Sequence, residues 1–208
     1  MKRSLFALAL AAALPLSAHA AERDNGLSYT YFEGDYVSGD VQGINSMDGF
    51  ALRGSAHFGK NWYATGSLSR VSKGDIDLGY SVPVDVDFEQ TVLGIGWHAD
   101  ISDNAAFIAE AAYLRDAFEV ENNSVGSADD SFSGYRLTAG LRGNLGKRFE
   151  GEVKAHWSDL QDIDGGFGGE INGLFKINTT WGITAGWQTD DLGDDNVDAW
   201  HVGVRASY

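Results

Sequence analysis

The sequence predicts an all-β protein made of a single transmembrane antiparallel up-and-down β-barrel, with ten strands expected and eight as the alternative number. Three observations lead to this prediction. The N-terminus has the features of an export signal, and apolar and polar side chains alternate through most of the remaining chain. The alternating segments are also joined by two classes of connection, which themselves alternate. A length of 208 residues agrees with one domain.

The N-terminus resembles a secretory signal peptide. Residues 2–3 (KR) give a charged start, residues 5–14 form an apolar run, and residues 18–20 (AHA) provide a small-residue cleavage site. The apolar run is too short for a membrane-spanning helix. We therefore expect residues 1–20 to be a cleaved signal peptide and residues 21–208 to form the barrel.

Composition excludes several classes of function. The chain has 30 Asp and Glu residues against 15 Lys and Arg residues, which gives a formal net charge of −15. Nucleic acids are bound by clustered cations, so we expect no nucleic-acid partner. The chain has no cysteine, which excludes disulfides and thiolate metal sites.

Period-two alternation predicts the strands. In residues 149–157, for example, Phe149, Val153 and Trp157 share one face, while Glu150 and Lys154 share the other. The ten expected strands cover residues 27–36, 50–58, 62–69, 90–98, 107–113, 135–142, 149–157, 167–177, 181–188 and 200–208.

Short and long connections alternate between these segments. Tight turns are expected at 59–61, 100–104, 145–148 and 178–180, and longer acidic loops at 40–47, 74–87, 122–130, 160–166 and 190–197. Short turns at one end and long loops at the other, together with an even strand number, are typical of outer-membrane barrels.

The apolar face of the strands is expected to face lipid. A soluble sandwich or barrel would also alternate, but three features favour the membrane: strands of about ten residues, the export signal, and aromatic residues at both strand ends. The aromatics near tight turns are Phe58, Trp62, Trp97, Phe107, Phe149, Phe175, Trp181 and Tyr208, and those near long loops are Trp157, Trp187 and Trp200. In the first strand, an ionised carboxylate facing lipid would be unfavourable, so we place Glu33 in the lumen and Phe32 towards lipid.

The polar face is expected to form a network of opposite charges in the lumen. Heights counted from the tight turns place Glu33 level with Arg53, Lys154 level with Glu170, and Arg142 near Glu152. The predicted network consists of Glu33, Arg53, Glu110, Arg136, Arg142, Glu152, Lys154, Glu170, Lys176 and Arg205, joined by Glu150. Because unpaired buried charge is costly, we expect ion pairs to plug most of the lumen. A narrow water-filled pore for small solutes remains the alternative.

Signs of catalysis are weak, and we do not expect an enzyme. An outer-membrane hydrolase is the second alternative, and its only plausible pieces are residues 156–159 (HWSD) and 198–201 (DAWH). His57, His98 and the other histidines lack the spacing of a metal site, so neither a metal nor a cofactor is expected.

The long loops are acidic, which raises the possibility of Ca²⁺ or Mg²⁺ binding at the cell surface. The alternative is a solvated rim, since no EF-hand spacing is present. The loop carboxylates are Asp190, Asp191, Asp194, Asp195 and Asp198; Asp75, Asp77, Asp85 and Asp87; and Asp159, Asp162 and Asp164.

Residues 27–34 (LSYTYFEG) and 200–208 (WHVGVRASY) resemble the first and last strands of the Ax family of small outer-membrane barrels. That family carries two labels, activator of plant immunity and sulfation-dependent quorum factor. The resemblance implies an outer-membrane barrel linked to quorum sensing, biofilm or host recognition. Apart from the resemblance, we expect a monomer with a structural or surface-interaction role. The label includes a tyrosine-sulfated peptide; we interpret Tyr29, Tyr31 and Tyr36 as strand residues.

The last strand also resembles the signal that the barrel-assembly machinery reads, which is formed by Trp200, Val202, Val204, Ala206 and Tyr208. The partners expected on these grounds are that machinery, outer-membrane lipid and lipopolysaccharide.

Overall fold

The computed structural model describes residues 25–208 except 42–43, 77–83, 123–125, 162 and 193–194. The described residues form ten strands: β1 (Tyr31–Val41), β2 (Ile44–Phe58), β3 (Trp62–Ile76), β4 (Val84–Ser102), β5 (Ala105–Asn122), β6 (Gly126–Asn144), β7 (Phe149–Leu160), β8 (Ile163–Lys176), β9 (Trp181–Leu192) and β10 (Asp195–Ser207). Within these residues, no helix is long and apolar enough to cross a membrane. The predicted signal peptide, residues 1–20, lies outside the described part.

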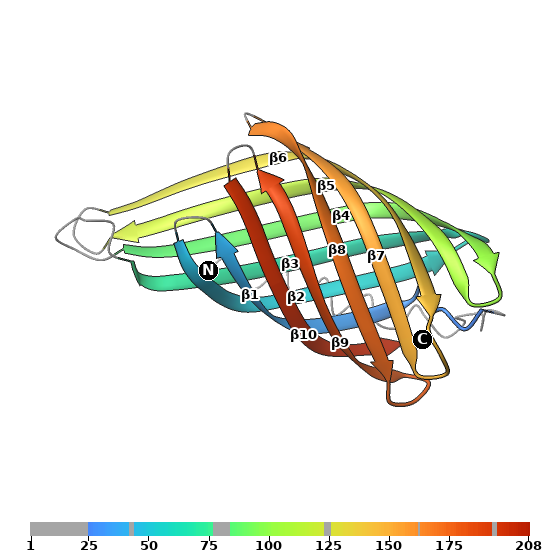
Figure 1. Cartoon of the computed structure of the whole chain (residues 1–208). Coiled ribbons are helices and arrows are strands. Elements are labelled where there is room, and N and C mark those ends of the chain that lie inside the picture. Colours follow the sequence, from blue (N-terminus) through green and yellow to red (C-terminus); the bar gives the residue numbers. More distant parts are fainter. Residues whose placement is uncertain (1–24, 42–43, 77–83, 123–125, 162, 193–194) are drawn as a thin grey trace.

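The strands form one closed barrel, which confirms the predicted fold class and strand number (Figure 1). Each strand pairs antiparallel with its neighbours in sequence, and β1 pairs with β10 to close the sheet. Closure leaves no unpaired edge in the middle of the barrel, as a hydrocarbon environment requires. At the loop end, residues 126–133 of β6 pair with β5 and, among the described residues, have no partner on β7. The register agrees with the predicted alternation, since Glu33 pairs directly with Arg53 and Lys154 pairs directly with Glu170.

The four tight turns lie where the sequence placed them. Gly59, between β2 and β3, adopts a φ of 66°, a left-handed conformation that glycine tolerates best. The long acidic loops, in contrast, were predicted wrongly. Most of their residues belong to the strands, and β4 and β6 each reach 19 residues. Together with β5, these two strands extend furthest towards the left of Figure 1.

The strands were underestimated because their polarity inverts along their length. In the middle of the barrel the outward face is apolar, with Leu93, Leu137 and Val153 each about half exposed. Towards the loop end of β3–β5, the outward face carries Arg70, Asp87, Glu89, Arg115 and Glu119. Arg70 and Asp87 form an ion pair of 3.1 Å there. When the apolar residues move from one face of a strand to the other, the period-two pattern is interrupted. In the sequence, this interruption resembles the end of a strand.

Aromatic residues mark both edges of the apolar outer belt. Tyr36, Trp200 and Tyr113 belong to the edge at the loop end, and Trp62 and Trp181 to the edge at the turn end. On β7 the two edges are Trp157 and Phe149, eight residues apart. At about 3.3 Å per residue, this separation is about 26 Å along the strand and about 20 Å along the membrane normal for a tilt of about 40°, a little less than the usual apolar band of about 25 Å.

The first strand begins later than expected, at Tyr31 rather than Leu27. Residues 25–30 instead enter the barrel mouth, where Leu27 and Tyr29 are buried. The strand also continues to Val41, beyond the predicted end at Tyr36. Glu33 lies in the lumen, as expected, with 1% of its surface exposed.

Several luminal glycines lie against bulky neighbours on adjacent strands. A side chain at Gly96 would collide with the ring of Tyr63, one at Gly186 with Asn172 and His201, and one at Gly203 with Asp35. Because these three glycines have no side chain, the lumen has room for the neighbouring aromatic and polar groups.

A lysine in the middle of the outer belt tests its lipid exposure. Val153→Lys is expected to lower the free energy of unfolding in lipid vesicles by about 2–4 kcal/mol, the cost of a cation at the bilayer midplane. Ser72→Lys, on the same face but beyond the belt, is the matched control and should change stability by less than about 1 kcal/mol. Equal effects of the two substitutions would contradict the position of the belt.

Candidate functional site: the charged lumen

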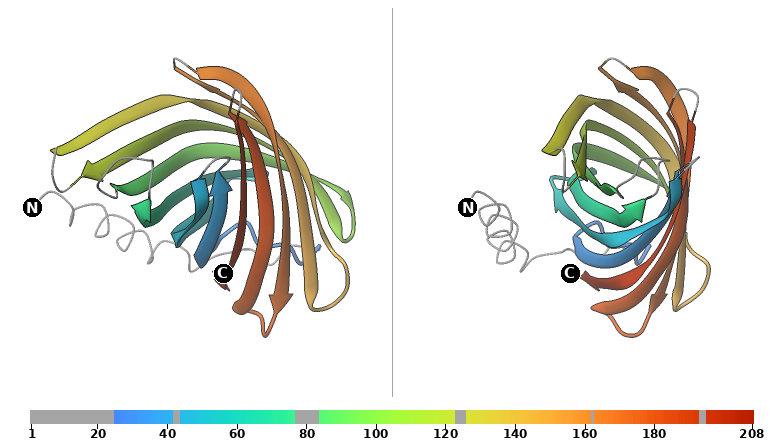
Figure 2. Two further views of the ribbon diagram at one scale, coloured as in Figure 1. Left: turned by 60° about the vertical axis from the view of Figure 1, so that its left-hand side comes forward. Right: turned by 90° about the vertical axis from the view of Figure 1, so that its left-hand side faces the viewer.

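The lumen has three layers along the barrel axis. An apolar plug occupies part of the turn end, charged side chains occupy the middle, and a second apolar group lines the loop end. The barrel that encloses them is seen from two sides in Figure 2. The middle layer contains most of the residues predicted from sequence.

The plug is built around the N-terminal segment, residues 25–30. Leu27 and Tyr29 pack with Tyr63, Ala106 and Ile108, all at most 3% exposed. The ring of Tyr29 also stacks on that of His98, with centroids 4.1 Å apart.

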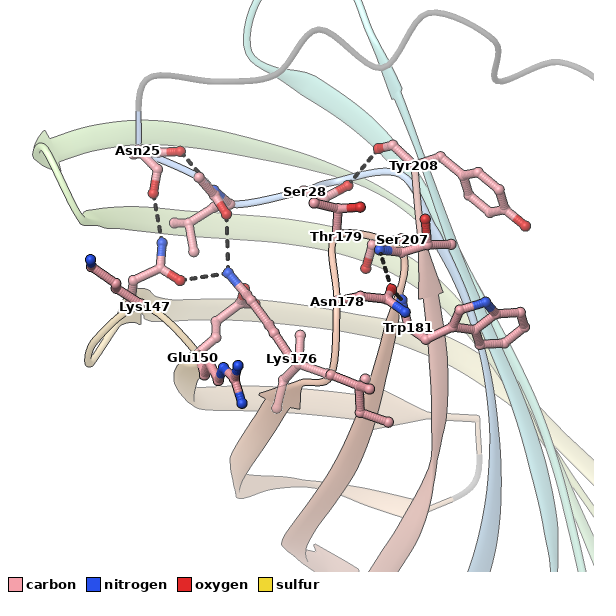
Figure 3. Close-up of a pocket in the computed structure, with 18 of the residues that line it drawn as sticks. Asn25, Ser28, Lys147, Glu150, Lys176, Asn178, Thr179, Trp181, Ser207 and Tyr208 are labelled. Atoms are coloured by element: carbon pink, nitrogen blue, oxygen red, sulfur yellow. Dashed lines mark hydrogen bonds and ion pairs between the residues drawn. The ribbon is translucent and has the colours of Figure 1, made fainter.

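Hydrogen bonds fix this segment in the mouth (Figure 3). Asn144 donates to the Asn25 carbonyl at 2.6 Å, and Lys176 donates to the Gly26 carbonyl at 3.1 Å. Ser28 Oγ donates to the Tyr208 carbonyl oxygen at 2.8 Å. A mouth cavity of about 1250 Å³ remains beside the segment, lined in part by Lys147 and Trp181.

Glu33 is the first centre of the charged layer. Its carboxylate accepts from Arg205 Nε at 2.5 Å and lies 3.5 Å from Arg53. Arg53 is also 3.7 Å from Asp35 and 2.9 Å from His201 Nε2. The group joins β1, β2 and β10 across the seam that closes the barrel.

Glu150 is the second centre and receives three cations. Arg142 lies 2.5 Å away, Lys176 3.1 Å and Arg205 3.8 Å. Arg205 on β10 and Glu150 on β7 are not on adjacent strands, so this contact crosses the lumen. Arg142 on β6 also lies 4.9 Å from the centre of the Tyr29 ring, which comes from the other side of the barrel.

The third group surrounds Lys154. Its ammonium lies 3.0 Å from Glu152 and 3.9 Å from Glu110, which in turn accepts from the Tyr63 hydroxyl at 2.7 Å. Glu170 is the register partner of Lys154, but it accepts a hydrogen bond from the Asn172 amide at 2.5 Å. Arg142 is 3.9 Å from Glu152, so these two predicted neighbours do lie together.

Arg136 belongs to a fourth group, nearer the loop end. It donates to Ser158 Oγ at 2.9 Å and to Asp190 at 3.0 Å. His156 Nε2 lies 2.6 Å from the same Asp190 oxygen. Asp190 was assigned to an acidic outer loop, and this was wrong: it belongs to β9, faces the lumen and is 7% exposed.

Between these groups remains a cavity of about 120 Å³, lined among others by Arg53, Glu110, Arg136 and Glu170. Its polar walls and its size suit a few water molecules.

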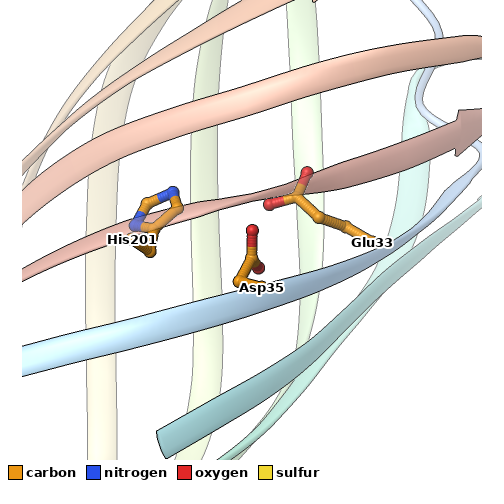
Figure 4. A group of neighbouring side chains, drawn as sticks. All are labelled: Glu33, Asp35 and His201. Carbon is orange, nitrogen blue, oxygen red and sulfur yellow. The ribbon is translucent and has the colours of Figure 1, made fainter. Parts of the chain in front are cut away.

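Glu33, Asp35 and His201 each offer an atom within 4.8 Å of the others, the geometry of a three-ligand metal site (Figure 4). Their surroundings argue against that use. Arg53 contacts all three side chains, and Arg205 contacts Glu33 as well. Two guanidinium groups already supply the positive charge that these carboxylates need.

The candidate hydrolase residues do not converge. His156 and Ser158 face the lumen with 5% of their surface exposed, whereas Asp159 faces outwards and accepts from the Tyr135 hydroxyl at 3.0 Å. Within the described residues, His156 pairs with Asp190 and Ser158 pairs with Arg136, and no contact joins His156 to Ser158.

Sequence reasoning missed Asp35, Asp190, His156 and His201 as members of the network, along with Asn172. Their signal was present, because each has the parity of a predicted luminal residue on its own strand. Ion pairs between non-adjacent strands could not be predicted this way, since contacts across the lumen depend on the curvature of the closed barrel.

The described acidic residues at the loop end have mixed roles. Asp87 pairs with Arg70, Asp159 accepts from Tyr135, and Asp191 and Asp198 are exposed. Asp77, Asp162 and Asp194 lie outside the described residues.

No family model matches the chain, and no curated protein matches its sequence. Solved structures do match its fold. The NanC porin aligns with a TM-score of 0.51 and 12% identity over 84% of this chain and 100% of that one. The translocator domain of the autotransporter NalP from Neisseria meningitidis aligns with a TM-score of 0.51 and 12% identity over 88% and 90%.

Ail, the attachment invasion locus protein of Yersinia pestis, gives a TM-score of 0.47 and 16% identity over 87% of this chain and 97% of that one. The structures with TM-scores of 0.51 show that the chain has the fold of outer-membrane β-barrels. At these identities the likeness concerns the fold alone.

Removing one carboxylate from the network tests whether it holds the barrel together. Glu33→Gln leaves Arg205 and Arg53 without their shared partner, and we expect a loss of about 3–5 kcal/mol in the free energy of unfolding in detergent micelles. Glu119→Gln, on the outer face beyond the belt, should lie within about 0.5 kcal/mol of the wild type. A Glu33→Gln barrel as stable as this control would show that the ion pairs contribute nothing.

Proposed function

We propose that this protein is a monomeric integral outer-membrane barrel with a closed lumen and no enzymatic activity. Its role is either structural, in the cell envelope, or depends on surface interactions at its outer end. The observation that carries the proposal is the combination of an apolar outer surface, bordered by aromatic residues, with an interior whose charged side chains form ion pairs. A water-soluble protein has the opposite arrangement.

Several features support placement in the outer membrane. The exposed belt is apolar, and four of the five residues of the assembly signal lie on the surface of β10 and at the chain end: Trp200, Val202, Val204 and Tyr208. The fifth, Ala206, has the same parity but is 5% exposed, between its register partners Phe32 and Trp181. We propose membrane lipid, lipopolysaccharide and the barrel-assembly machinery as partners.

A closed lumen is supported by contacts between strands that are not neighbours in the barrel. Arg205 reaches Glu150 from a non-adjacent strand, and Arg136 reaches Asp190 in the same manner. Residues 25–30 fill part of the mouth, so ions would have to pass both the plug and the charged layer.

The finer assignments remain predictions. Membership of the Ax family, with its links to quorum sensing, biofilm and host recognition, depends on the residues of the first and last strands. Cleavage of residues 1–20 and binding of Ca²⁺ or Mg²⁺ by exposed carboxylates such as Asp191 and Asp198 are proposals of the same standing.

Planar-bilayer recording separates a closed barrel from a narrow porin. We expect the refolded protein to insert without steady conductance at moderate voltage, since paired charges occupy the lumen. The triple variant Arg142→Ala, Glu150→Ala and Lys154→Ala removes both the bulk and the charge at this level, and it should conduct. Steady wild-type conductance would overturn the closed lumen and favour a small-solute channel.

A further inference from the structure

The loop end of the lumen carries an apolar surface that the proposed structural role does not use. Val37, Met47, Ala51, Val71 and Val86 pack together there, with Phe88 and Ala199 against them. The surface continues through Phe118, whose ring centre lies 4.7 Å from that of Phe88 and 6.5 Å from that of Phe132. We call Phe88, Phe118 and Phe132 the inner aromatic row; they come from β4, β5 and β6.

The inner aromatic row is accessible from outside the barrel end. Phe118 is 37% exposed, and Phe88 and Phe132 are half-buried. The outward face of β4 and β5 carries Glu89, Arg115 and Glu119 here, so this part of the sheet lies beyond the apolar belt. An exposed aromatic surface in water favours contact with a partner.

A buried carboxylate lies directly beside this row. Asp116 shares the luminal face of β5 with Phe118 and Leu114, and Phe132 is its register partner. Asp116 is 2% exposed, and among the described residues its Oδ1 atom has no hydrogen-bond partner. Its side chain does bond Gln90, which leaves one carboxylate oxygen for a donor that the described residues do not provide.

The charge around this end favours a cation. Among the described residues with exposed side chains at this end, the cations are Arg70 and Arg115. The carboxylates outnumber them: Asp40, Asp48, Asp85, Glu89, Asp130, Asp191 and Asp198. Such an excess raises the local concentration of cationic ligands and repels anionic ones.

We propose that the inner aromatic row and Asp116 bind a cationic amphipathic peptide. Its apolar side chains would pack on Phe88, Phe118 and Phe132, and one of its ammonium or guanidinium groups would donate to Asp116 Oδ1 as the Phe118 ring moves aside. This inference names a class of partner for the proposed surface role. It rests on that proposed role, because the peptide reaches the loop end from outside the membrane.

The test uses the refolded chain in zwitterionic detergent and a fluorescent peptide of alternating lysine and leucine clusters, with binding followed by anisotropy. A lysine–serine peptide of equal charge and a glutamate–leucine peptide of equal hydrophobicity are the probe controls. We expect the lysine–leucine peptide to bind at least about tenfold more tightly than either, because binding needs both the charge and the apolar surface.

Two variants address the site itself. Asp116→Asn keeps the shape of the side chain and should weaken binding about tenfold or more, as expected for loss of a charge-assisted hydrogen bond. Glu119→Gln removes the same charge from the opposite face of β5 and should bind like the wild type. Phe118→Ser, at an exposed position, should weaken binding and serves as the second variant if Asp116→Asn does not fold.

Wild-type affinity in both Asp116→Asn and Phe118→Ser would overturn the proposal, and so would equal binding of the lysine–serine peptide, which would assign all attraction to the acidic rim. Failure here is distinguishable from failure of the proposed function. A barrel that inserts into membranes without binding the peptide contradicts only this inference, whereas a chain that remains soluble contradicts the membrane role.

Discussion

Successive side chains of a strand point to opposite faces, so each strand of this barrel has to suit two environments at once. In the belt, the outer face meets the requirement with leucine, isoleucine, valine and aromatic residues that are about half exposed. The inner face then has to hold the polar side chains in a space closed off by the same ten strands. Closure of the sheet provides hydrogen-bond partners for the backbone N–H and C=O groups, and ion pairing stabilises the charged side chains of the interior.

The charged interior depends on this enclosure. Glu33 and Glu150 each collect more than one guanidinium or ammonium group, and Arg205 connects them. In water such pairs would contribute little, but an unpaired member inside the barrel is strongly unfavourable. The same argument explains why Arg53 lies among Glu33, Asp35 and His201, where its guanidinium supplies positive charge to the two carboxylates.

Sequence reasoning recovered the fold because period two survives in a single chain. It gave the strand number, the tight turns, the luminal position of Glu33 and the level of Glu33 with Arg53. It misplaced the strand ends, because the change of faces near Arg70 and Arg115 interrupts the pattern that defines a strand. It also missed the insertion of Leu27 into the mouth and the partners of Asp190, since both depend on which side chains meet across a closed barrel.

The chain contains no cysteine, so a single introduced cysteine can carry a spin label at any chosen position. The most direct test of the account is to label residues 149–160 of β7 one at a time in lipid vesicles and to measure collision with oxygen and with a polar nickel complex. We expect oxygen accessibility to peak at Val153 and at the other outward positions, and both reagents to be excluded from Glu150, Glu152 and Lys154. Access of the nickel complex to Val153 in place of oxygen would contradict a lipid-facing belt around a closed, charged core.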